Sequence, residues 1–169
     1  KGENMIRYKL EKHIVAFPSK IAASAGSPHI YNIRLTADHD NGTLVGRGAW
    51  VAFDEYEETT APTFAGVIQE QAANGNWYVE VTADTDALFV YDSPIIAEDY
   101  NSEFRKESNF FNEAGKTVKA YSLIKGDIFE LSADAFTGDP EKGGTLAYAE
   151  GKYTVTPPEE DEDEEDIGA

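Results

Sequence analysis

Cysteine is absent from this chain of 169 residues, which excludes disulfide bonds, cysteine-based zinc sites and thiol nucleophiles. Histidine is scarce, and His13, His29 and His39 share no spacing typical of a metal site. No apolar run approaches the roughly 20 residues that cross a bilayer as a helix, and no secretory signal is visible. We therefore expect no membrane partner. A chain without disulfides favours an intracellular or virion setting.

Motifs for catalysis are also missing. The sequence contains no G-x-S-x-G elbow and no glycine-rich loop of the phosphate-binding form. The segment Asp38–Gly42 begins like a calcium-binding loop, but its fifth position is Gly42 and its twelfth is Ala49, where the loop needs an oxygen ligand and a glutamate. We predict a polar hairpin turn there, and a protein that is not an enzyme and binds no cofactor or metal.

Basic residues are few, with 14 Lys and Arg against 32 Asp and Glu, so the net charge is −18. Residues 159–166 contribute −8, residues 1–27 carry +3, and the remaining −13 lies between them. Such a body repels phosphate, so we expect no nucleic-acid partner. The basic residues of the first segment are candidate contacts for an acidic protein surface, with an ordinary solvated arm as the alternative. They are Lys1, Arg7, Lys9, Lys12 and Lys20.

Short apolar–polar alternations separated by turn residues fill the chain from residue 29 onward, and hydrophobic residues make up 41% of it, enough for a core. In residues 77–82, Trp77, Val79 and Val81 alternate with more polar residues, as in a strand with two distinct faces. The pattern predicts a mainly β fold, as a single β-sandwich or a partly open β-barrel domain. The expected strands are residues 30–36, 43–53, 64–70, 77–82, 88–91, 118–124, 128–132, 145–148 and 152–156.

Three regions are expected: an N-terminal arm at residues 1–27, a β-rich domain at 28–156 and a disordered acidic tail at 157–169. The arm gives two conflicting signals. Its apolar residues Ile6, Leu10, Ile14 and Phe17 are spaced like one face of a helix, whereas residues 14–18 also fit a short extended piece ended by Pro18. Residues 94–108 fit either a long loop or a short helix.

Four aromatic residues, Trp50, Tyr56, Trp77 and Tyr78, have the side chains from which a sugar-binding platform would be built. Because Trp77 alternates with apolar residues along its strand, we expect it on the core face instead. A β-sandwich module that binds carbohydrate or a cell surface is therefore the alternative function.

The stretch Phe110–Ser132 reads as a turn, a strand, a second turn and a second strand. Its defining residues are Asn112, Gly115, Tyr121, Gly126, Asp127 and Phe129. Together with the Asn-Gly turn in Asp40–Val45 and the closing Gly151–Val155, their order and spacing resemble the auxiliary head proteins of tailed bacteriophages. The resemblance spans roughly residues 30–156.

The resemblance implies a virion structural protein, a decoration protein that binds the outer face of an assembled capsid and stabilises it. The implied partners are the major capsid protein and, as an open alternative, further copies of this chain. The implied location is the virion, with the host cytoplasm during assembly. The basic residues of the arm would then lie against the capsid. A tail-tube subunit is a third reading, which predicts ring assembly and a long insertion hairpin.

Overall fold

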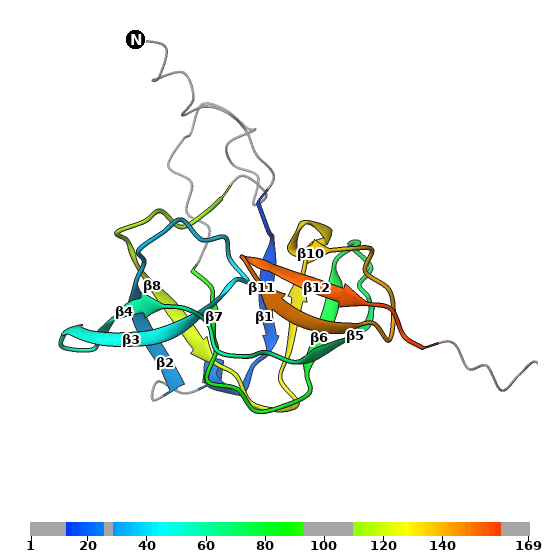
Figure 1. Cartoon of the computed structure of the whole chain (residues 1–169), viewed down its shortest axis with the longest axis horizontal. Helices are drawn as coiled ribbons and strands as arrows, with labels where there is room; N and C mark the ends of the chain where they lie inside the picture. Colours follow the sequence, from blue (N-terminus) through cyan, green and yellow to red (C-terminus); the bar gives the residue numbers. More distant parts are fainter. Residues whose placement is uncertain (1–12, 26–28, 93–109, 160–169) are drawn as a thin grey trace, which may run out of the picture.

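The computed structural model describes residues 13–25, 29–92 and 110–159, which form two β-sheets (Figure 1). One is an open sheet of seven strands in the order β1-β9-β6-β5-β11-β12-β10, and the other is a closed barrel of β2, β4, β3, β7 and β8. The strands are Ala16–Lys20 (β1), Ile30–Arg34 (β2), Leu44–Ala52 (β3), Glu55–Thr59 (β4), Gly66–Gln71 (β5), Trp77–Val81 (β6), Leu88–Val90 (β7), Thr117–Ser122 (β8), Ile128–Leu131 (β9), Phe136–Thr137 (β10), Thr145–Ala149 (β11) and Lys152–Thr156 (β12). Within the described ranges, the helical elements are two short 3-10 turns, Ala22–Ala25 (η2) and Ala133–Ala135 (η6).

The barrel closes through β2, which pairs in parallel with β4 on one side and antiparallel with β8 on the other. Ile33 of β2 lies opposite both Tyr56 and Val118. The remaining barrel pairs, β3 with β4, β3 with β7 and β7 with β8, are antiparallel. Each barrel strand thus has a neighbour on both sides, although β3 pairs with β7 only through Leu44 and Val45 and extends beyond it to Ala52.

Alternation along the barrel strands builds two cores. One set of side chains fills the barrel interior: Ile33, Leu35, Val45, Leu88, Val90, Val118 and Ala120. Their neighbours Leu44 and Phe89 point the other way and join a larger cluster shared with the open sheet. Because adjacent residues of a strand face opposite sides, the same strands serve both cores.

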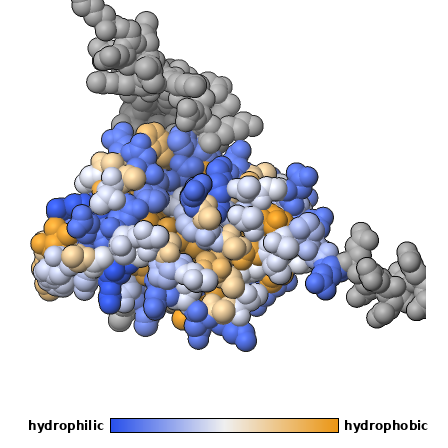
Figure 2. Space-filling view, in the orientation of Figure 1, coloured by the Kyte–Doolittle hydropathy of each residue, from blue (hydrophilic) through white to orange (hydrophobic). Residues whose placement is uncertain are grey.

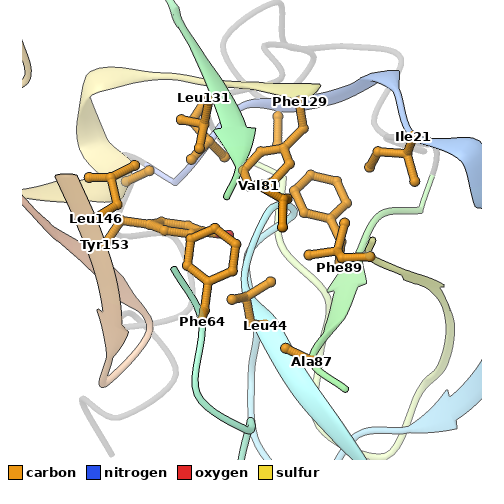
Figure 3. Close-up of a cluster of buried hydrophobic side chains, with 14 of the residues drawn as sticks. Ile21, Leu44, Phe64, Val81, Ala87, Phe89, Phe129, Leu131, Leu146 and Tyr153 are labelled. Carbon is orange, nitrogen blue, oxygen red and sulfur yellow. The ribbon is translucent and has the colours of Figure 1, made fainter. Parts of the chain in front are cut away.

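The larger core lies between the barrel and the open sheet and is rich in aromatic rings (Figure 3). The rings of Phe89 and Phe129 are 4.6 Å apart, and those of Phe64 and Tyr153 are 5.5 Å apart. Tyr153 is fully buried, and its hydroxyl donates a hydrogen bond of 2.6 Å to the carbonyl of Gly42. This bond ties β12 of the open sheet to the turn that precedes β3 of the barrel.

The prediction of a mainly β chain is confirmed, and the structure adds detail that the sequence did not indicate. We expected one sandwich or a partly open barrel, whereas the chain forms a closed barrel together with an open sheet. Three observed strands are not among the nine expected ones: β1, which was given only as one of two readings of the arm, and β4 and β10, which were missed. β4 is rich in glutamate, which has low strand propensity, and β10 has two residues, too few to show a period.

The first described residues belong to the open sheet. Ala16 of β1 lies opposite Leu131 of β9, and Ile14 and Ile21 are buried. The helical reading is therefore wrong there. The extended reading is confirmed in part, because β1 begins at Ala16 and continues past Pro18 to Lys20. The β-rich region thus begins before the expected boundary at residue 28. Four of the predicted arm contacts, Lys1, Arg7, Lys9 and Lys12, lie outside the described residues, as do the segment 94–108 and residues 160–169 of the expected tail.

Candidate functional site

The residues that carry the phage-protein resemblance occupy separate structural positions and do not form one surface. Gly115 and Gly126 lie in turns with positive φ of 87° and 99°. Phe129 is fully buried in the larger core, and Tyr121 packs half-buried against it. Burial, reinforced by the Asp92 carboxylate, raises the pKa of Tyr121. These residues shape turns and fill the core, so they support the fold and are not themselves a docking surface.

Asn112 is also structural, because it is fully buried against the Asn-Gly turn. Its side-chain amide donates to Asn41 Oδ1 at 3.1 Å, and its backbone forms a two-bond bridge with His39. The Asn41 side chain in turn bonds to the backbone N–H and carbonyl of Asp92. A turn is present at Asn41-Gly42, but the prediction of a hairpin turn is wrong, because β2 pairs with β4 and β8 and not with β3. The Asn41-Gly42 step is buried, where it joins three chain segments.

Asp127 caps the turn between β8 and β9. One carboxylate oxygen accepts the backbone N–H of Ala22 at 3.1 Å, and the other accepts that of Ile124 at 2.9 Å. The residue is 4% exposed, so these bonds satisfy a carboxylate that would otherwise be costly to bury.

Two histidines near the Asn-Gly turn each pair with a different carboxylate. His13 Nδ1 lies 2.6 Å from Asp40 Oδ1, and His39 Nε2 contacts a carboxylate oxygen of Glu58. Asp38 accepts a backbone N–H at 2.8 Å. In the part of the chain that the structure describes, no three histidine or acidic side chains converge as metal ligands. The acidic residues of this turn therefore make tertiary contacts and do not surround an ion position.

Exposed apolar side chains gather at the end of the β3–β4 hairpin, which projects from the barrel (Figure 1). Phe53 is 90% exposed, Trp50 58% and Val51 37%. Figure 2 shows hydrophobic residues at this end of the molecule, bordered by hydrophilic ones. We call Trp50, Val51 and Phe53 the hairpin tip. Clustered exposed apolar residues mark interaction surfaces more often than single ones do.

The hairpin is held in place by polar contacts at and beside its turn. Asp54 adopts a left-handed conformation (φ 56°) at the turn, and Asn32 Nδ2 donates to its carboxylate at 3.0 Å. Glu55 accepts hydrogen bonds from the Thr117 hydroxyl at 2.8 Å and from Arg34 Nε at 2.9 Å. The Thr117 bond, with a smaller effect of Arg34, holds the pKa of Glu55 below its ordinary value. These contacts join the hairpin to β2 and β8.

A chain of ring contacts runs from the tip to the barrel. The Trp50 ring meets Phe53 at 6.4 Å and Tyr56 at 5.4 Å, and Tyr56 meets Tyr31 at 6.1 Å. The Trp50 and Tyr56 rings are nearly perpendicular, at 89°, so they do not form the flat platform on which a sugar ring would stack. Trp77 is half-buried against the larger core, as expected.

Sequence reasoning placed Trp50 and Tyr56 among the aromatic candidates but missed the tip as a unit. We expected residues 43–53 to be one strand, so the apolar run was assigned to strand faces. The structure ends β3 at Ala52, which leaves Phe53 in the turn. The available signal was an apolar run, Trp50–Phe53, directly before the polar Asp54-Glu55 step, because a turn is normally polar.

Of the predicted basic contacts, Lys20 alone lies in the described residues, where it is exposed at the end of β1. It lines a surface hollow of about 520 Å³ together with Glu70 and Glu80. Its surroundings are therefore partly acidic, and the structure does not place Lys20 in a basic patch.

No helix within the described ranges is both apolar and long enough to span a bilayer. Comparison with known proteins finds no matching family model, no matching curated protein and no matching solved structure for this chain.

Proposed function

We propose that this chain is a non-enzymatic decoration protein of a tailed phage, which binds the outer face of an assembled capsid through the hairpin tip and stabilises the shell. The observation that carries the proposal is the exposed apolar tip of Trp50, Val51 and Phe53 on a hairpin anchored to a closed barrel. The resemblance of Phe110–Ser132 to auxiliary head proteins supports a capsid as the surface that is bound.

The tip provides modest binding energy per copy. Complete burial of a side chain such as Phe53 contributes about 1.5–3 kcal/mol, and the partly covered Trp50 contributes less. Such a contact becomes effective on a lattice, because linked copies that contact neighbouring subunits gain avidity. A ligand that binds only the assembled shell stabilises that shell by mass action.

Charge indicates what the tip contacts. Asp54, Glu55 and Glu57 lie directly beside it, and the whole chain carries −18. Two identical hairpins would therefore repel each other, which disfavours self-association through this face. The complementary partner is an apolar pocket with a basic rim, which we assign to the major capsid protein.

The test mixes purified protein with bare capsids of its phage and counts bound copies by sedimentation and electron microscopy. The double variant Trp50→Ala/Phe53→Ala removes the tip, and Ile124→Ala is the matched control because Ile124 is 51% exposed on a different turn. We expect at least tenfold weaker binding for the double variant and unchanged binding for the control, with equal melting temperatures. Full occupancy by the double variant would exclude the hairpin as the contact, and lack of binding by the unmodified chain would overturn the proposed function.

A carbohydrate- or cell-surface-binding module is the alternative. The perpendicular rings of Trp50 and Tyr56 argue against a stacking platform at the tip, so we assign the tip to a protein partner. We further propose that the basic residues of segment 1–12 make a second capsid contact, because they are separated in sequence from the acidic body.

A further inference from the structure

A groove of about 430 Å³ opens at one end of the barrel, where β7 begins and β8 ends. Its walls combine four kinds of group: the aromatic ring of Tyr31, the guanidinium of Arg47, the carboxylate of Asp86 and hydroxyls that include those of Thr60 and Ser122. The volume falls in the range of small-molecule sites, and barrel mouths are among the places where such sites occur. The groove is separate from the hairpin tip, because none of the tip residues lines it.

Arg47 is the distinctive group in this groove. Its guanidinium carbon lies 5.0 Å from the centroid of the Tyr31 ring and 5.1 Å from that of Tyr56, so it is held by two aromatic faces. Its guanidinium forms no ion pair with a carboxylate among the described residues. Arg34, by contrast, is paired with Glu55. Arg47 therefore presents hydrogen-bond donors suited to the carboxylate of a ligand.

The other lining groups limit the chemical class of ligand that the groove can bind. Asp86 faces the same groove without pairing to Arg47, so a ligand that is only an anion would meet repulsion there. A ligand that is only a neutral sugar would leave Arg47 without an acceptor. A sugar that carries a carboxylate suits both Arg47 and Asp86. Its acid group pairs with Arg47, and its hydroxyls donate to Asp86 and exchange hydrogen bonds with Thr60 and Ser122.

We propose that the barrel-mouth groove is a binding site for an acidic saccharide, with Arg47 as the carboxylate-binding residue. Tyr31 and Leu88 supply apolar surface for the sugar ring. None of the hairpin-tip residues lines the groove, so a chain attached through the tip would still present this site.

The test is an NMR titration of the full-length ¹⁵N-labelled chain with four probes: methyl glucuronide, methyl glucoside, acetate and the peptide Gly-Glu-Gly. We expect saturable shifts at Gly46, Arg47 and Ser122 with the glucuronide, and at least tenfold weaker binding of the other three. Arg47→Gln should weaken glucuronide binding at least tenfold and leave glucoside binding unchanged. Arg34→Gln is the matched control, since it removes a barrel arginine that does not line the groove.

Three results would overturn the proposal. The first is the absence of saturable shifts at the barrel mouth with the glucuronide. The second is equal loss of binding in the Arg47 and Arg34 variants. The third is tighter binding of Gly-Glu-Gly than of the glucuronide, which would assign the groove to a protein ligand. Unchanged amide spectra away from the groove establish that each variant is folded.

Discussion

Removing one buried hydroxyl, by Tyr153→Phe, tests how the open sheet is joined to the barrel. The hydroxyl donates to the Gly42 carbonyl at 2.6 Å inside the larger core, and Tyr153 is 0% exposed. The substitution keeps the ring and its packing but leaves a buried carbonyl without that donor. Such a loss costs about 1–3 kcal/mol, so we expect the free energy of unfolding at pH 7 to fall by that amount.

The same residue predicts a pH dependence. Burial, with a smaller effect of Tyr148, raises the pKa of Tyr153 well above its ordinary value of 10.0. The folded state therefore keeps the proton at a pH where the unfolded chain loses it, and the stabilisation is fully present below pH 10 and lost above it. In this range each such tyrosine lowers the free energy of unfolding by about 1.4 kcal/mol per pH unit. Tyr153→Phe lacks this loss, so the stability gap between the two proteins should narrow above pH 10.

Urea unfolding followed by tryptophan fluorescence, from pH 7 to pH 11.5, measures both effects. Tyr78→Phe is the control, because Tyr78 is only partly buried, lines the same surface hollow as Lys20, and its hydroxyl has no hydrogen-bond partner among the described residues. A Tyr153→Phe protein as stable as the unmodified chain at pH 7 would refute the role of the hydroxyl. A gap that stays constant up to pH 11.5 would refute the linkage.

Three further predictions concern single structural features. Asp127→Ala should lower the free energy of unfolding by about 1–3 kcal/mol, measured by urea unfolding, because two backbone N–H groups lose a charged acceptor. Gly42→Ala should lower the melting temperature through a loss of roughly 2–4 kcal/mol, since φ is +87° and a Cβ would lie 2.7 Å from two core side chains. Deleting residues 1–12 should weaken capsid binding without changing the melting temperature. Extending the deletion through residue 25 should unfold the chain, because it also removes β1. Equal melting temperatures for the two deletion variants would contradict the placement of β1.

The strands with regular alternation were predictable because their signal is local. Trp77–Val81 and Lys152–Thr156 were expected at nearly or fully their observed bounds. The Asn-Gly turn was predictable for the same reason, since turn preference resides in the residues themselves. Its burial was not, because that depends on Asn112 arriving from 71 positions away.

The candidate sites were harder to predict than the fold. Trp50 and Phe53 are aromatic residues like those that pack against the core elsewhere in this chain. Trp50 lies within β3 and Phe53 in the turn after it, and only the tertiary structure shows that this end of the hairpin is in solvent. Arg47 reads in sequence as a residue between two glycines in a strand. Its role becomes apparent only in the folded structure, where Tyr31 from β2 and Asp86 from the loop before β7 lie around the same groove.

By itself, then, the sequence determined the β character, the acidic charge and the lack of cysteine chemistry, because composition and period-2 patterning are properties of neighbouring residues. The tertiary structure decided that the barrel closes, that residues 13–25 belong to the sheet and that one aromatic group stays exposed. Each of these depends on pairing between segments distant along the chain, such as β2 with β4 and β1 with β9. The energy of such pairing cannot be read from the pattern of neighbouring residues.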